Sequence, residues 1–166
     1  MPLSKIISES VDLTDNFDFT GQLLQNGAGI GGDNKPAFIS YVNGSQSLGN
    51  NTTTNVVLTE SYDSDGAFAS NTFTVPNGKA GRYWLGAKLM FHEPSNDISM
   101  LIIYIKKNGT QALYSRNQNL GTAALSQFVI QEGINVSGIL DLAVGDAITL
   151  DVYATSGSGG TTVFGS

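Results

Sequence analysis

One stretch near the middle of the chain decides the fold class: Arg82-Tyr83-Trp84-Leu85-Gly86-Ala87-Lys88-Leu89-Met90-Phe91. Its apolar residues recur at every second position, which is the period of a β-strand, whereas a helix would scatter them around its axis. One face carries Tyr83, Leu85, Ala87, Leu89 and Phe91, and the other carries Trp84, Gly86, Lys88 and Met90. We therefore predict a long strand that turns the first of these faces toward a core.

The segments on both sides of this stretch show the same period of two, and no segment shows a convincing helical period. Ile98 to Lys107 is apolar on both faces, so we expect it to be buried on both sides, and Asn108-Gly109 after it predicts a tight hairpin. The other predicted strands are residues 37–42, 55–58, 72–75, 111–115, 127–130, 134–142 and 147–154. About nine or ten short strands without helices predict an all-β sandwich or barrel.

The composition excludes several classes of function. Charged residues are only 13% of the 166 residues, about half the ~25% of an ordinary globular protein. The absence of cysteine excludes disulfides, thiolate metal sites and thiol nucleophiles. A net charge of −6 argues against nucleic acid as a partner, and the longest apolar runs are too short for membrane insertion.

The chain separates into two regions by composition. Residues 1–32 end in the glycine-rich stretch 26–32, which is typical of a flexible linker, and residues 33–166 form the strand-rich domain. In the first region Val11, Leu13, Phe17 and Phe19 alternate with polar residues and predict a small hairpin with one apolar face. Because an isolated hairpin is marginal in water, this docking segment needs a partner surface or folds back on the main domain.

Four groups of residues resemble the complement component 1q globular-head family, a branch of the tumour necrosis factor superfamily. The first is the pair Phe73-Thr74-Val75-Pro76 and Gly81-Arg82-Tyr83-Trp84-Leu85-Gly86-Ala87. The others are Lys35-Pro36-Ala37-Phe38-Ile39-Ser40, Tyr104-Ile105-Lys106-Lys107-Asn108-Gly109, and the stretch 137–148 with Gly145-Asp146. The resemblance covers about residues 33–166. The loop between Phe73 and Gly81 is two residues longer than the family pattern, and the final strand stops early at Val163-Phe164-Gly165-Ser166.

The resemblance implies a ten-stranded jelly roll that assembles as a homotrimer around the outer face of one sheet. Trp84, Met90 and Tyr104 are the interface candidates that follow from it, although any one aromatic residue is as readily explained as part of the core. Residues 4–6 and 12–17 also resemble, more weakly, the lead-in of bacteriophage and cyanophage fibre heads. That second resemblance implies a trimerising or docking segment and other virion proteins as partners.

The sequence contains fragments of catalytic and cofactor-binding motifs, but the neighbouring residues that such sites require are missing. Residues 27–32 match G-x-G-x-x-G, but Asp33-Asn34-Lys35-Pro36 cannot open the helix on which a dinucleotide phosphate would rest. His92 is the only histidine, and no G-x-S-x-G elbow supplies a nucleophile for it. We therefore predict a protein that is not an enzyme and that has no cofactor and no transition-metal site.

Two further features are candidates for ligand binding. Asp63-Ser64-Asp65-Gly66 resembles the start of a calcium loop, but the remaining acidic ligands are missing, so an ordinary acidic turn is favoured. Tyrosine, asparagine and arginine side chains near loops suit the recognition of a sugar, although an ordinary solvated loop is the favoured explanation for any single one of these residues. The ligand-loop candidates are Tyr41, Asn43, Tyr62, Asp63, Asp65, Tyr114 and Arg116.

Together these features predict a trimeric head on a virus particle, made in the host cytoplasm and binding a host-surface receptor or a glycan. An uncharged surface without cysteine or a recognisable secretion signal fits this class. The alternative is a trimeric decoration or cement protein of a capsid, anchored by residues 1–32. A secreted cellular ligand is disfavoured, and an enzyme is the least favoured class.

Overall fold

The computed structural model describes Leu24–Gln25, Ala28–Gly29 and residues 36–92, 98–118, 131–157 and 161–164. The chain divides into two compact units, Met1–Asn34 and Lys35–Ser166. In the first unit two short strands, β1 (Leu24–Gln25) and β2 (Ala28–Gly29), pair antiparallel. The predicted docking residues Val11, Leu13, Phe17 and Phe19 lie outside the described residues. None of the described ranges contains a helix that is long and apolar enough to cross a membrane.

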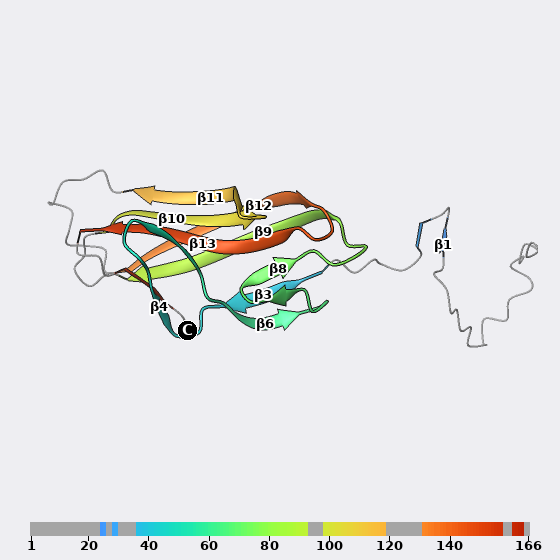
Figure 1. The fold of residues 1–166 in the computed structure, drawn as a ribbon, viewed down its shortest axis with the longest axis horizontal. Coiled ribbons are helices and arrows are strands. Elements are labelled where there is room, and N and C mark those ends of the chain that lie inside the picture. The colour runs from blue at the N-terminus through green and yellow to red at the C-terminus, as the bar shows by residue number, and fades with distance from the viewer. Residues whose placement is uncertain are drawn as a thin grey trace, which may run out of the picture. The chain divides into compact units, whose positions relative to one another are not determined.

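The second unit is built from β-strands that form two main sheets and one small sheet (Figure 1). The five-stranded sheet has the order β11-β10-β13-β8-β7, the four-stranded sheet has the order β12-β9-β14-β4, and β3 pairs with β6. The strands are β3 (Phe38–Tyr41), β4 (Ser45–Ser47), β5 (Thr52–Asn55), β6 (Thr59–Asp63), β7 (Phe68–Ala69), β8 (Thr72–Thr74), β9 (Gly81–His92), β10 (Ile98–Lys107), β11 (Thr110–Gln118), β12 (Gln131–Leu142), β13 (Ala147–Ser156) and β14 (Thr162–Phe164). Neighbouring strands come from distant parts of the chain, which confirms the predicted all-β jelly roll.

Strand β9 places its two faces as the sequence predicts. Leu85, Leu89 and Phe91 are buried in the core between the two sheets, whereas Trp84 and Met90 point outward and are exposed. The whole strand pairs antiparallel with β12 in an unbroken register, from Gly81 beside Leu142 to His92 beside Gln131. The alternation of apolar residues therefore decides which side chains reach the core and which remain available on the surface.

The core is formed by the inner faces of both sheets. The largest side chains that are completely enclosed are Phe73, Phe91, Leu101 and Ile103. Phe38 attaches the small sheet to this core, because its ring stacks on Phe73 and on Phe68 with centroid distances of 4.8 and 5.2 Å.

Two of the predicted strands need correction. The predicted strand 55–58 is wrong, because Asn55 is the last residue of β5 and residues 56–58 link β5 to β6. Val56 is drawn into the core, and its backbone N–H donates to the Leu150 carbonyl over 2.9 Å. Strand β10 is fully buried on one face, whereas on the other face Ile102 is buried and its neighbours Met100 and Tyr104 are half-buried. The predicted strand 127–130 lies outside the described residues.

A carboxylate joins the two hairpin turns that carry the family resemblance. Asn108 adopts the positive φ that a tight turn needs, and its side-chain amide donates to Asp146 Oδ1 over 2.7 Å. Lys107 Nζ lies 2.7 Å from Asp146 Oδ2, and the Ala143 backbone N–H donates to the same oxygen over 2.7 Å. The amide oxygen of Asn108 in turn accepts from the Ala147 backbone N–H over 2.8 Å. The β10–β11 turn is thereby fastened to the β12–β13 turn.

These contacts lower the pKa of Asp146 from 3.8 to about 2, first through the bond to Lys107 and then through those to Ala143 and Asn108. A carboxyl whose pKa is lower in the folded than in the unfolded protein stabilises the fold above its unfolded pKa. That stabilisation is lost as the pH falls from about 4 to about 2.

We therefore expect Asp146→Asn to be less stable than the wild type at pH 7, and the difference to shrink as the pH falls from 4 to 2. Thermal unfolding followed by circular dichroism across this range measures the difference. Asp141→Asn is the matched control, because the Asp141 carboxylate pairs with Arg82 over 3.2 Å in the open, with both side chains about 80% exposed. Exposed pairs of this kind contribute little. Equal effects of the two substitutions at every pH would contradict the role of Asp146.

Candidate functional site

The outer face of the four-stranded sheet carries large apolar side chains that the fold does not cover. Trp84 on β9 lies beside Ile139 on β12, and their side chains are 71% and 65% exposed. Near the other end of the sheet Met90 lies beside Phe164 on β14, and both are exposed. We call these four residues the apolar face. Exposed apolar patches of this kind typically mark surfaces that another protein covers.

The indole of Trp84 lies flat along its own strand. A Cβ atom added at Gly86 would come within 2.7 Å of the Trp84 ring, so only glycine leaves room for the ring in this position. The ring thus rests on backbone and remains open to solvent on its other side. The glycine at 86 is therefore part of the apolar face, although it has no side chain of its own.

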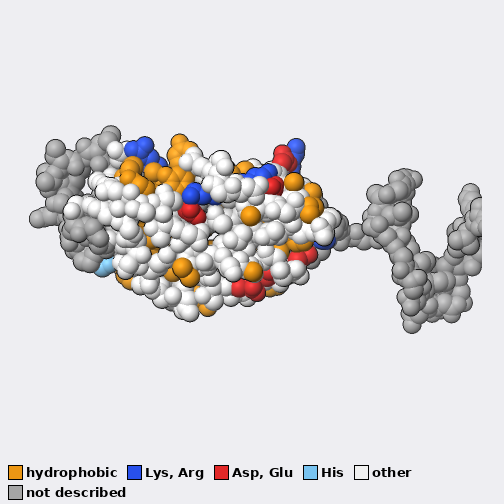
Figure 2. Space-filling view, in the orientation of Figure 1, with side chains coloured by type: hydrophobic (Ala, Val, Ile, Leu, Met, Phe, Trp, Pro, Cys, Tyr) orange, Lys and Arg blue, Asp and Glu red, His pale blue; other side chains and the backbone are white. Residues whose placement is uncertain are grey.

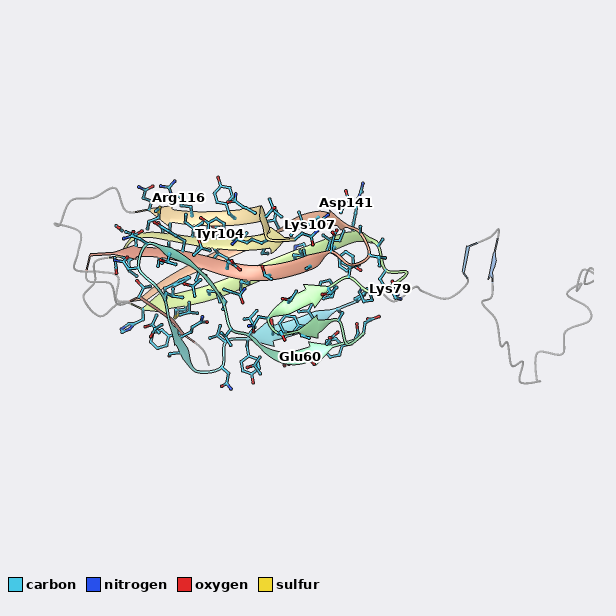
Figure 3. The ribbon with its side chains drawn as sticks, viewed as in Figure 1. Glu60, Lys79, Tyr104, Lys107, Arg116 and Asp141 are labelled. Carbon is cyan, nitrogen blue, oxygen red and sulfur yellow. The ribbon has the colours of Figure 1, made fainter. Side chains whose placement is uncertain are left out.

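The outer face of the five-stranded sheet has a different chemistry. Tyr104 on β10 lies beside Tyr114 on β11, which is 58% exposed. The neighbouring pair is Ile102 and Arg116, and Tyr153 on β13 lies on the other side of Ile102. We call Tyr104, Tyr114, Tyr153 and Arg116 the tyrosine face. Figure 2 shows hydrophobic side chains, a class that includes tyrosine, beside basic ones over this part of the molecule, and Figure 3 labels Tyr104 and Arg116.

The tyrosine face is held in place by a partly buried ion pair. Lys106 Nζ lies 2.6 Å from Asp151 Oδ2, and Asn55 Nδ2 donates to the other oxygen of Asp151 over 2.9 Å. The ammonium group of Lys106 lies 6.0 Å from the centre of the Tyr104 ring, within the range of a cation–π contact. Because Lys106 is held by Asp151, its contact with Tyr104 helps to fix the position of that ring on the tyrosine face.

The segment that follows β4 closes the free edge of β13. The Asn50 amide binds both the N–H and the carbonyl of Ser156, at 3.0 and 2.9 Å. Asn51 Oδ1 accepts from the Thr155 hydroxyl over 3.0 Å. The side-chain amides of Asn50 and Asn51 thus attach this segment to β13, which gives a structural explanation for the asparagines found here.

The predicted site residues fall in separate places. Of the three interface candidates, Trp84 and Met90 share the apolar face, whereas Tyr104 lies on the opposite sheet and does not join them. Of the ligand-loop candidates, Tyr114 and Arg116 lie together on β11. The remaining candidates lie on the small β3–β6 sheet, as do Tyr41, Tyr62 and Asp63, or in the loops that adjoin it, as do Asn43 and Asp65.

Sequence reasoning missed three residues of these faces: Ile139, Phe164 and Tyr153. Ile139 could have been predicted from the alternation along its strand. It is separated by an odd number of residues from the inward-facing side chains, so it must point outward; these inward-facing residues are Ile134, Val136, Leu140 and Leu142. Phe164 and Tyr153 join their faces through strand pairing with β9 and β10, which the local pattern does not reveal.

In the acidic turn that resembles the start of a calcium loop, the Asp63 carboxylate accepts hydrogen bonds from the local backbone. Asp63 Oδ1 accepts from the Asp65 N–H over 3.1 Å, and Asp63 Oδ2 accepts from the Phe68 N–H over 2.7 Å. This is the local hydrogen bonding for which turns favour aspartate. Among the described residues, no group of three or more His, Asp or Glu side chains is placed to hold a metal ion.

His92 ends β9 and contacts an aromatic ring. Its imidazole lies 5.1 Å from the Phe164 ring in an edge-on arrangement. The acidic residues next to it in the sequence, Glu93 and Asp97, lie outside the described residues. The histidine therefore belongs to the border of the apolar face.

Comparison with known proteins gives a structural likeness only. No protein-family model and no curated protein matches the sequence. Among the similar solved structures is a crystal structure of murine APRIL at pH 8.5, which superposes with a TM-score of 0.43 at 15% sequence identity. The matched region covers 79% of this chain and 98% of that one.

Two glycines on adjacent strands offer a matched test of this geometry. A Cβ at Gly138 on β12 would come within 2.8 Å of the Leu113 side chain, which packs against the core, whereas a Cβ at Gly86 meets only the exposed ring of Trp84. We expect Gly138→Ala to lower the free energy of unfolding by about 1–3 kcal/mol through overpacking. Gly86→Ala should change it by less than about 0.5 kcal/mol but shift the emission of the only tryptophan. Urea unfolding followed by fluorescence measures both, and equal losses of stability would contradict the placement of the Trp84 ring.

Proposed function

We propose that the chain is a non-enzymatic binding head that assembles as a homotrimer and binds a host-surface receptor or glycan. The observation that carries the proposal is the contrast between the two outer faces of the sandwich. One face exposes Trp84, Ile139, Met90 and Phe164, and the opposite one presents tyrosines beside an arginine. Two faces of different chemistry suit two different partners.

The apolar face is the surface proposed for self-assembly. Full burial of one large apolar side chain is worth about 1.5–3 kcal/mol, so four of them supply a substantial part of an interface. The polar residues on this face of the sheet, such as Lys88 and Asn135, form a pair between the two apolar pairs. The number of copies rests on the resemblance to complement 1q heads, in which the apolar outer face of one sheet packs around a threefold axis.

The tyrosine face is the surface proposed for ligand binding. Tyrosine rings offer flat apolar platforms with a hydroxyl group at the rim, which is the combination that sugar rings require. Arg116 is fixed by a hydrogen bond to the Gln118 side chain and adds donors at the edge of this surface. Three copies of one such face on a rigid trimer would raise the apparent affinity for a repetitive surface through avidity.

The proposed location is a virus particle, with other virion proteins as neighbours. This part of the proposal rests on the resemblance of residues 4–6 and 12–17 to phage fibre lead-ins and on a surface with few charges and no cysteine. The net charge of −6 would keep the exposed heads soluble and mutually repelling.

The assembly is tested by breaking the apolar face. Wild-type protein should sediment with three times the mass of one chain, and Trp84→Glu combined with Ile139→Glu should sediment as a folded monomer, because charges would replace the centre of the interface. Tyr114→Glu on the opposite sheet is the control and should remain trimeric. Analytical ultracentrifugation measures all three, and a wild-type monomer at micromolar concentration would overturn the assembly.

Ligand binding is tested by comparing two tyrosines of similar exposure. On a glycan array, Tyr114→Ala should bind its best glycan about tenfold more weakly, which corresponds to about 1.4 kcal/mol. Tyr62→Ala is the control, because Tyr62 is 52% exposed on the separate β3–β6 sheet. Binding of a neutral sugar should change little with salt. A loss with Tyr62→Ala alone would assign binding to the small sheet instead.

A further inference from the structure

The outer face of the five-stranded sheet, on which the tyrosine face lies, carries more positive than negative charge. The chain as a whole has a net charge of −6. On the described strands β10, β11 and β13, however, the charged side chains of this face are two cations, Lys106 and Arg116, and one anion, Asp151. An excess of positive charge on one face of an acidic protein favours a negatively charged ligand there.

The carboxylate of Asp151 is already neutralised by groups of the protein. Lys106 Nζ lies 2.6 Å from Asp151 Oδ2, and Asn55 Nδ2 donates to Asp151 Oδ1 over 2.9 Å. The side chain of Asp151 is only 12% exposed, and that of Lys106 is 22% exposed. Lys106 and Asp151 thus cancel each other's charge, and Arg116 provides the net charge of this face.

Arg116 is an exposed cation that has no carboxylate partner in the described part of the chain (Figure 3). Its guanidinium donates to the neutral side-chain amide of Gln118. Other cations, such as Lys107 and Arg82, each lie against a carboxylate. The next stretch of sequence, residues 119–130, contains no acidic residue. Because a guanidinium has several N–H donors in one plane, Arg116 keeps donors available for an anionic group.

Tyr114 and Arg116 are spaced to contact one sugar together. They are two residues apart on β11, so both side chains leave the same side of the strand, roughly 7 Å apart at the backbone. The ring of Tyr114 is 58% exposed and lies beside Tyr104, so it offers a platform for a sugar ring. A carboxylate attached to that sugar ring can bridge the distance to the guanidinium.

We propose that the tyrosine face binds an acidic sugar, whose carboxylate pairs with Arg116 while its ring stacks on Tyr114. The planar fork of a guanidinium matches the two oxygens of a carboxylate, and such a pair contributes both charge and orientation. The inference rests on the proposed function of this face and adds the chemical class of the sugar. A neutral sugar would use the tyrosines but would leave the charge of Arg116 without a counter-ion.

The probes are oligosaccharides that carry carboxylates, each paired with the same compound after reduction of the carboxylate to a primary alcohol. Oligomers of galacturonate, mannuronate and guluronate, hyaluronan oligosaccharides and sialyllactose supply the acidic members. Reduction removes the charge and keeps the linkage and the ring. By isothermal titration calorimetry, we expect at least one acidic sugar to bind about tenfold more tightly than its reduced form. The inference is overturned if no acidic sugar binds more tightly than its reduced form.

Three substitutions assign the carboxylate contact. Arg116→Gln should bind the best acidic sugar about tenfold more weakly and should bind its reduced form as the wild type does. Arg116→Lys keeps the charge but loses the fork, so it should recover only part of the affinity. Arg82→Gln is the matched control, because Arg82 is also exposed but lies on the other sheet and is paired with Asp141. Equal losses in Arg116→Gln and Arg82→Gln would show an effect of net charge alone and would overturn the assignment.

Salt and a second kind of anion test the carboxylate itself. The affinity for the acidic sugar should fall as sodium chloride is added, whereas the affinity for the reduced form should stay nearly constant. A sulfated neutral oligosaccharide has charge without the planar carboxylate and should bind more weakly than the best acidic sugar. Tighter binding of the sulfated compound would overturn the carboxylate as the recognised group.

The failure of this inference can be told apart from the failure of the proposed function. If neutral sugars bind best and Tyr114→Ala weakens their binding, the tyrosine face is a sugar site but the acidic class is wrong. If Tyr114→Ala weakens the binding of no sugar, acidic or neutral, the proposed ligand face itself is wrong and the inference falls with it. Thermal unfolding followed by circular dichroism checks that each variant is folded.

Discussion

The register between β9 and β12 is the constraint on which the rest of the structure depends. Because side chains alternate with a period of two, a slip by one residue would turn Leu85 and Leu89 outward and bring Trp84 and Met90 into the core. Twelve consecutive pairs hold the register, from Gly81 beside Leu142 to His92 beside Gln131. The core and the apolar face both follow from this one alignment, since they use opposite sides of β9.

The Asp146 network protects the sandwich at the end where two hairpins turn. Each hairpin alone would be free to fray, but Asn108 and Asp146 bind each other's turns through side chain and backbone. Buried polar groups stabilise a fold only when their bonds are satisfied, and among the described residues no buried side-chain nitrogen or oxygen lacks a partner. The K-N-G and G-D motifs therefore have a common structural role, which explains why they occur together in one chain.

Much of the fold could be predicted from the sequence, because the alternation of apolar and polar residues along a strand determines which side chains face the core. The bounds of β10 and the inward face of β9 follow from apolar spacing, and the turn at Asn108-Gly109 follows from the need for positive φ. Residues 56–58 were wrongly predicted as a strand, because Val56 is held by a backbone hydrogen bond to Leu150 of β13, which is far away in the sequence. The two faces were only partly predictable for the same reason. Trp84 and Met90 share a strand, whereas Phe164 and Tyr153 reach their positions through pairing between distant strands.

Gly86 shows how the backbone shapes the surface that this chain exposes. Because glycine has no side chain, the Trp84 ring lies against its own strand instead of standing away from it. A larger side chain at this position would displace the ring and change the shape of the apolar face beside Ile139. The exposed surface of β9 therefore depends on a residue that adds no apolar area of its own.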